Sequence, residues 1–275
     1  MSIANKQIHL KYLLIVFGML FSSILYGQTK TDAQLYAIWK DSSKPEIVRL
    51  EAIWERMDFD SLPRQEPEWW QKWKNETKEA IKLALKQNKR GYLPLFYMMT
   101  IEACAGNTEC MCAAAKKVIE SAKVANDSKL PFIFWAYGIL KFQCNEDVKE
   151  EVIINEFNKM KSSLSDKPSD LKILRDANLE FGTWYKLNEK YPQALVYFLE
   201  TQRLSEELKL IDYTYGRSNE ELAGIHAQIG NYKEAEKYID KSLQVAHSRK
   251  DTFSLGSSYL GKSQLMIKLK DEAKA

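Results

Sequence analysis

The sequence predicts an all-α protein built as an array of stacked helix pairs. Eleven glycines and seven prolines are few for 275 residues, and Leu, Ala, Glu and Lys are abundant, which favours helices over sheets. In the second half of the chain a small residue recurs three times, and each time an alanine follows it at the same distance. Together these observations predict an α-solenoid of antiparallel helix pairs.

The recurring distance between the small residue and the alanine is twelve residues. It runs from 182 to 194, from 223 to 235 and from 261 to 273. Small residues at these places let a second helix approach the first closely, and larger residues such as Tyr185, Phe198 and Ile239 fill the space between successive pairs. Pro192 fits the first turn of a second helix, and Gly230-Asn231 suits a helix end followed by a turn.

Residues 171–275 resemble the tetratricopeptide repeat family. The family pattern G-x2-Y…A-x3-F is present as Gly182, Tyr185, Ala194 and Phe198. The repeats are 41 and 38 residues apart, from 182 to 223 and from 223 to 261, whereas the family repeat has about 34. The chain departs from the family at two positions of the repeat. Where the family prefers Trp, the chain has Asn178, Asn219 and Ser257, and where the family has Tyr, it has His226 and Gln264. The resemblance implies a right-handed superhelix that is more degenerate toward the N-terminus.

Four regions are expected along the chain. They are a signal peptide at 1–27, an N-terminal helical segment at 28–66, degenerate repeat-like helix pairs at 67–170, and tetratricopeptide-type repeats at 171–275 with the last one incomplete. Before the repeats, helices are predicted at 31–40, 45–57, 67–89, 93–105, 109–125, 134–142 and 147–160, with a linker at 58–66.

Residues 1–27 have the layout of a secretory signal peptide. Lys6 and Lys11 precede an apolar stretch from Tyr12 to Tyr26, and polar residues follow Gly27. The stretch has about 15 residues, whereas a membrane span needs about 20. We therefore expect an exported protein, periplasmic or extracellular, with cleavage near Gly27. The alternative is an uncleaved leader, which would then be the only contact with the membrane.

The charge balance argues against a nucleic-acid partner. Of the 40 basic residues, two lie in the leader, which has no acidic residue, so residues 28–275 hold 38 basic and 37 acidic groups and a net charge of +1. Proteins that bind nucleic acid usually gather a basic surplus on one face. The chain also has no phosphate-binding loop, no G-x-S-x-G and no H-E-x-x-H. We expect no enzymatic activity, no cofactor and no metal.

The four cysteines, Cys104, Cys110, Cys112 and Cys144, allow three interpretations. In an exported protein an even number of cysteines permits disulfides, and a bridge across the predicted turn at Gly106-Asn107 is geometrically reasonable. Cysteines also serve as small buried residues in helix packing. A zinc site is the third interpretation, although C-x5-C-x-C with a distant fourth cysteine is not a usual zinc spacing.

The histidines and a tryptophan cluster are interpreted as structural. His226 occupies an aromatic packing place in its repeat, and His247 lies near the end of a second helix, where a cation suits the helix dipole. Trp69, Trp70 and Trp73 form an aromatic face on one helix, which we expect to pack against a neighbouring helix. A patch that contacts sugar or membrane is the alternative for these tryptophans.

The function implied by the resemblance is binding of a protein or peptide. In the family, stacked first helices line a concave groove that accepts a helix or an extended segment. By this resemblance the groove candidates are Asp176, Thr183, Lys186, Arg217, Glu220, Ser258 and Lys262.

An alternative function is the sensing of a ligand outside the cytoplasm. The leader, the segment LYAIWKDSSKPEIVRLEAIWERM and the long repeats resemble the exported sensor halves of Bacteroidetes-type signalling proteins. The resemblance implies that a membrane helix and an output domain are missing from this chain. We also expect Leu260, Leu265 and Ile267 to form an uncovered apolar face, because the chain stops two residues after Ala273.

Overall fold

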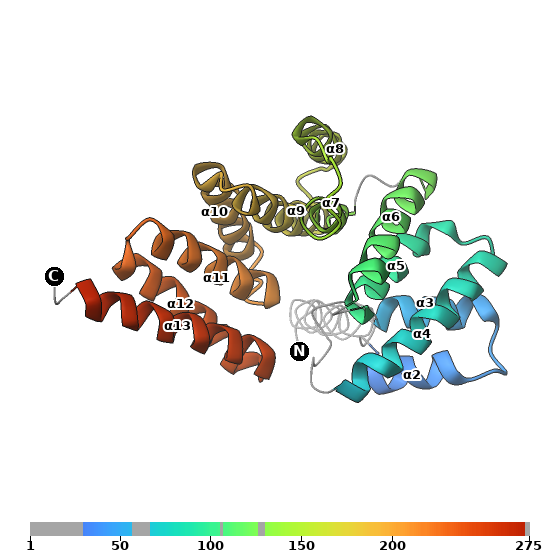
Figure 1. Ribbon diagram of the computed structural model, residues 1–275. Helices are drawn as coiled ribbons and strands as arrows, with labels where there is room; N and C mark the ends of the chain where they lie inside the picture. Colours follow the sequence, from blue (N-terminus) through green and yellow to red (C-terminus); the bar gives the residue numbers. More distant parts are fainter. Residues whose placement is uncertain (1–29, 57–66, 105–106, 126–129, 273–275) are drawn as a thin grey trace, which may run out of the picture.

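The computed structural model describes residues 30–56, 67–104, 107–125 and 130–272. These residues form twelve α-helices and one short 3-10 helix, and no strand is present among them. The helices follow one another in chain order along an arc (Figure 1). The predicted all-α fold with successive packing of helix pairs is therefore confirmed.

The helices divide into a first half and a second half. The first half consists of α2 (Asp32–Lys40), α3 (Glu46–Arg56), α4 (Pro67–Lys86), η1 (Arg90–Tyr92), α5 (Leu93–Ala103) and α6 (Thr108–Ala125). The second half consists of α7 (Ile133–Phe142), α8 (Glu150–Ser163), α9 (Pro168–Leu187), α10 (Tyr191–Glu207), α11 (Tyr213–Gln228), α12 (Tyr232–Arg249) and α13 (Thr252–Glu272).

Several predictions fall outside the described residues. They are the signal peptide at 1–27, the linker at 58–66, the turn residue Gly106, the repeat residue Ala273, and the side chains of Trp69 and Trp70. Trp73 is buried, and the guanidinium of Arg56 lies over its ring, so the structural interpretation holds for this tryptophan. In the described part of the chain, no helix combines the length and the apolarity needed to cross a membrane.

The predicted helices before residue 165 are all present, but α4 ends at Lys86 rather than at 89, and α8 is shifted as a whole. We predicted a helix at 147–160, but α8 spans Glu150–Ser163. The shift has a local cause at the end of α7. Asn145 has a positive φ of 54°, and the backbone N–H groups of Cys144 and Glu146 donate to the carbonyls of Ile139 and Leu140. These bonds satisfy the last carbonyls of α7 and delay the next helix.

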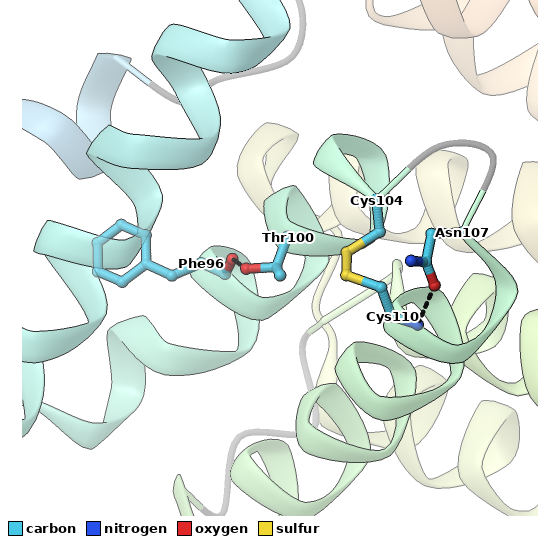
Figure 2. Close-up of a disulfide and its surroundings, with 5 residues drawn as sticks. All are labelled: Phe96, Thr100, Cys104, Asn107 and Cys110. Atoms are coloured by element: carbon cyan, nitrogen blue, oxygen red, sulfur yellow. Dashed lines mark hydrogen bonds between the residues drawn. A yellow bond between two sulfur atoms is a disulfide. The ribbon is translucent and has the colours of Figure 1, made fainter.

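Two disulfides fasten the middle of the array. One joins Cys104 at the end of α5 to Cys110 in the first turn of α6, with Cα atoms 5.6 Å apart (Figure 2). In the same turn the side-chain oxygen of Asn107 accepts a hydrogen bond from the backbone N–H of Cys110 and so caps α6. The other joins Cys112 on α6 to Cys144 after α7. All four cysteines of the chain are therefore paired.

Close crossings between helices occur at the small residues that the sequence singled out. A Cβ atom on Gly182 would lie 2.8 Å from the ring of Phe198, so α9 and α10 touch where no larger residue fits. Ala194 on α10 and Ala235 on α12 have no exposed surface. A Cβ on Gly261 of α13 would lie 3.4 Å from Ile239 of α12. The close approach predicted at Gly182 is confirmed, whereas Gly261 packs on the preceding helix α12 and its predicted partner Ala273 lies outside the described residues.

Aromatic rings join one helix pair to the next. Phe157 of α8 stacks on Phe181 of α9, with ring centroids 4.4 Å apart and planes 9° from parallel. Phe134 of α7 and Tyr197 of α10 pack against the same two rings. This cluster lies within one hydrophobic core that runs from Trp39 in α2 into α11. A smaller cluster joins α11 and α12 to α13.

The apolar face expected on α13 is only partly exposed. Leu260 and Ile267 are both 61% exposed, as expected. The prediction was wrong for Leu265, which is buried in the cluster with Ala235 and Ile239. Leu265 lies four residues after Gly261, so both residues share the helix face that packs on α12.

The glycine crossing can be tested with two alanine substitutions. Gly182→Ala should lower the free energy of unfolding by about 1–3 kcal/mol, because the added methyl group meets the buried ring of Phe198. Gly138→Ala is the matched control in α7, where a Cβ meets nothing within 4 Å. It should raise the free energy of unfolding by about 0.5–1 kcal/mol, because helical glycine costs backbone entropy. Urea denaturation measures both, and equal effects at the two positions would contradict the crossing.

Candidate partner-binding surface

The first helices of successive pairs contact one another and form one layer. In this layer α7 contacts α9, α9 contacts α11, and α11 contacts α13. We call these four helices the first-helix layer. Among the hollows that these helices line are a large hollow of about 610 Å³ and a small hollow of about 220 Å³. The large hollow is of the size usual for ligand pockets, which is about 300–1,000 Å³.

The large hollow has an apolar floor and a polar rim. Buried side chains from α11, α12 and α13 form the floor, among them Ala223, Ala235, Ile239 and Leu265. The rim consists of Lys186, Glu220, Glu221, Gln228, Gln264 and Lys268. Small residues at the floor explain why the hollow exists, because short side chains leave the space between the helices unfilled.

The small hollow lies between α7 and α9 and is mainly aromatic. Phe134, Trp135 and Trp184 line it. At its edge Phe142 is 38% exposed and Leu187 is 49% exposed. Partly exposed large apolar side chains around a hollow are typical of surfaces that bind proteins or peptides.

A chain of three ion pairs separates the two hollows. Glu180 and Arg217 line the small hollow and lie 3.4 Å apart. Arg217 also contacts Glu221 at 3.9 Å, and Glu221 binds the amine of Lys186 at 2.5 Å on the rim of the large hollow. These four side chains neutralise one another across α9 and α11. They therefore hold α9 against α11, and their charges are balanced without a charged group from a binding partner.

Glu220 differs from its charged neighbours because its carboxylate is hydrogen-bonded to a hydroxyl group rather than ion-paired. Its carboxylate accepts a hydrogen bond from Ser258 Oγ, which lies 3.0 Å from Ser242 Oγ. The described residues supply no ion pair to this carboxylate. Burial is the main cause that raises the pKa of Glu220, and the charge of Glu221 adds to it. The hydroxyls of Ser258 and Ser242 and the charge of Arg217 act in the opposite direction on this pKa.

Four of the seven groove candidates line the hollows. Thr183 and Arg217 line the small hollow, and Lys186 and Glu220 line the large one. The structure thus brings these four together on adjacent sides of α9 and α11.

The other three groove candidates lie outside both hollows. Asp176 pairs with Arg175 and accepts a hydrogen bond from Thr214, so it links α9 to the start of α11. Ser258 has no exposed surface, and its hydroxyl donates a hydrogen bond to the Glu220 carboxylate. Lys262 pairs with Asp240 of α12 at 2.5 Å.

Sequence reasoning missed Glu180, Glu221 and the aromatic side chains of the small hollow. A signal for the acidic residues was available. The pairs Lys186–Glu221, Glu180–Arg217 and Glu220–Ser258 join residues 35, 37 and 38 positions apart. These separations are close to one repeat step. A search for complementary polar residues at that spacing would have found all three pairs.

The structure gives no support to the zinc interpretation of the cysteines, because each one is in a disulfide. Among the residues whose structure is described, no group of three or more His, Cys, Asp or Glu side chains could hold a metal ion.

Known protein-family models do not match this chain, and a search of curated proteins finds no match either. The resemblance to the tetratricopeptide repeat family therefore stays a prediction from the sequence.

The position of Glu220 predicts a pH-dependent stability. Folding raises the pKa of Glu220 above its ordinary value of 4.5, so the folded protein is most stable, as far as this group is concerned, when the carboxyl is protonated. That contribution to the free energy of unfolding is complete below pH 4.5 and is lost as the pH rises through the raised pKa. At neutral pH, Glu220→Gln should therefore raise the free energy of unfolding relative to the wild type. This advantage should shrink as the pH is lowered toward about 4.5, where Glu220 becomes protonated.

Urea denaturation at several pH values measures this difference. Glu151→Gln, at an exposed position on α8, is the control and should change stability little at any pH. A Glu220→Gln protein that is less stable than the wild type at neutral pH would show that the carboxylate is stabilised in its charged form.

Proposed function

We propose that this protein is an exported scaffold of the tetratricopeptide type that binds a segment of a protein or peptide on its first-helix layer. The two hollows in series on this layer are the observation that carries the proposal. An extended or helical segment lying across α9 and α11 would place one side chain in each hollow. Such anchoring of side chains in pockets supplies most of the affinity at interfaces between proteins and peptides.

The internal charge pairing favours binding over catalysis. Arg217, Glu180, Glu221 and Lys186 pair with one another, so they form a ridge of zero net charge between the two hollows. Catalytic groups usually need an accessible acid, base or nucleophile whose protonation suits the reaction. A preformed apolar surface with a neutral ridge instead suits recognition of a partner at little entropic cost.

Antiparallel pairing and a right-handed superhelix belong to this proposal. The connection from α9 to α10 spans only 188–190, and that from α11 to α12 spans 229–231. Two long helices that pack together across so short a connection must reverse direction. Stacking of such pairs in one sense generates the curved surfaces that repeat proteins use for binding.

Export is supported by the disulfides as well as by the leader. Disulfides form and persist in oxidising compartments such as the periplasm or the extracellular space. The bridges Cys104–Cys110 and Cys112–Cys144 leave no cysteine of this chain free. Together with the layout of residues 1–27, they favour a periplasmic or extracellular location.

The binding surface can be tested with peptides selected from a random display library on the immobilised protein. Leu187→Asp places a charge at the edge of the small hollow, where the side chain is 49% exposed. It should raise the dissociation constants of the selected peptides about tenfold, or by about 1.4 kcal/mol, because the new charge would have to be desolvated on binding. Fluorescence anisotropy with labelled peptides measures the dissociation constants.

Val196→Asp is the matched control, because Val196 is 64% exposed on α10 and lines neither hollow. It should leave peptide binding unchanged. If the library yields no binding peptides, or if the two variants weaken the selected peptides equally, the first-helix layer is not the binding surface.

A further inference from the structure

Resting on the proposed function, we propose that the large hollow contains a cation subsite in which Glu220 receives the charged end of a Lys or Arg side chain of the bound peptide. The partner class thus becomes a segment that places a basic residue in the large hollow. Glu220 on α11 and the apolar floor beneath it carry this inference.

Among the residues that the structure describes, no Lys or Arg forms an ion pair with the rim carboxylate of Glu220, and the charge of Arg217 is the favourable one that acts on it. Glu221, the next residue, is paired with Lys186 at 2.5 Å. Arg217, one turn earlier on α11, is engaged with Glu180. Ser258 donates a hydrogen bond to Glu220 and the Ser242 hydroxyl also acts on it, and neither residue contributes charge. The remaining cation of the rim, Lys268, is exposed on α13, where solvent screens its charge.

An anion held in this way is costly for the folded protein. Removal of a carboxylate from water costs free energy that hydroxyl donors offset only in part, whereas a cation with good geometry offsets much more of it. The raised pKa of Glu220 agrees with this cost. A residue that destabilises the folded state at a surface hollow is typical of a functional site, where stability is traded for binding.

The shape of the hollow favours a long basic side chain over a small cation. Its floor of Ala223, Ala235, Ile239 and Leu265 is buried and apolar. Lys and Arg side chains lay their methylene groups along apolar surface and keep the charged end at a polar rim. Glu220 stands three residues before Ala223 on the same helix, so it lies one turn along α11 from the floor. A basic side chain of the partner would therefore meet both features at once.

The test uses two labelled pools of random peptides, acetylated at the N-terminus and amidated at the C-terminus. One pool has a fixed central Arg flanked by leucines, and the other has citrulline, its uncharged isostere, at the same place. Anisotropy titrations of the wild-type protein should show that the Arg pool binds about tenfold more tightly or better. Raised salt should reduce this preference, because the subsite is open to solvent.

Glu220→Gln should remove the preference for the Arg pool over the citrulline pool. Glu151→Gln, on α8 and away from both hollows, should keep the preference. The wild-type comparison between Arg and citrulline needs no variant, so the inference is tested even if Glu220→Gln fails to fold.

The possible failures are distinguishable. If the wild type binds both pools equally, the cation subsite is overturned and the proposed peptide-binding surface stands. If Glu220→Gln folds and still prefers Arg, another group supplies the preference and the assignment to Glu220 is wrong. If neither pool binds, the proposed function itself is overturned, and the subsite with it.

Discussion

The stack of Phe157 on Phe181 is the contact that anchors α9, the central helix of the proposed binding surface. It joins α8 to α9, and the neighbouring rings of Phe134 and Tyr197 extend it to α7 and α10. Because Gly182 follows Phe181 directly, the same stretch of α9 contacts both the preceding helices α7 and α8 and the partner helix α10. Aromatic pairs in such geometry add about 0.5–1.5 kcal/mol beyond their burial. The small hollow exists because this cluster fixes α7 against α9.

Polar contacts between residues about one repeat apart in the sequence set the register of α11 against α9. Arg175 is fully buried and binds Asp212 at 2.7 Å, and Asp212 also caps the first turn of α11. Buried ion pairs are weak evidence for stability, but they penalise any other register, because a slip would leave a buried charge unpaired. The partly buried ion pairs from Glu180 to Lys186 join α9 to α11 in the same way. One set of contacts therefore aligns the helices and separates the two hollows.

The sequence predicted the helices and their close crossings better than it predicted the site. Gly182 was identifiable because the helix crossing requires a small residue at a fixed distance from the next alanine. Leu265 was misassigned, because the side of α13 that packs on α12 depends on tertiary contacts. Glu180 and Glu221 were missed for a similar reason. Their partners lie on another helix, one repeat away, and a pattern within a single helix does not reveal them.

Hydroxyl-radical footprinting of the protein, free and with a selected peptide bound, tests the central claim most directly. The bound peptide should reduce oxidation of Phe142, Leu187 and Ile267, which are exposed at the two hollows. Oxidation of Val196 and Leu199 on α10, which line neither hollow, should not change. Protection of the α10 side chains without protection at the hollows would contradict the assignment of the first-helix layer as the binding surface.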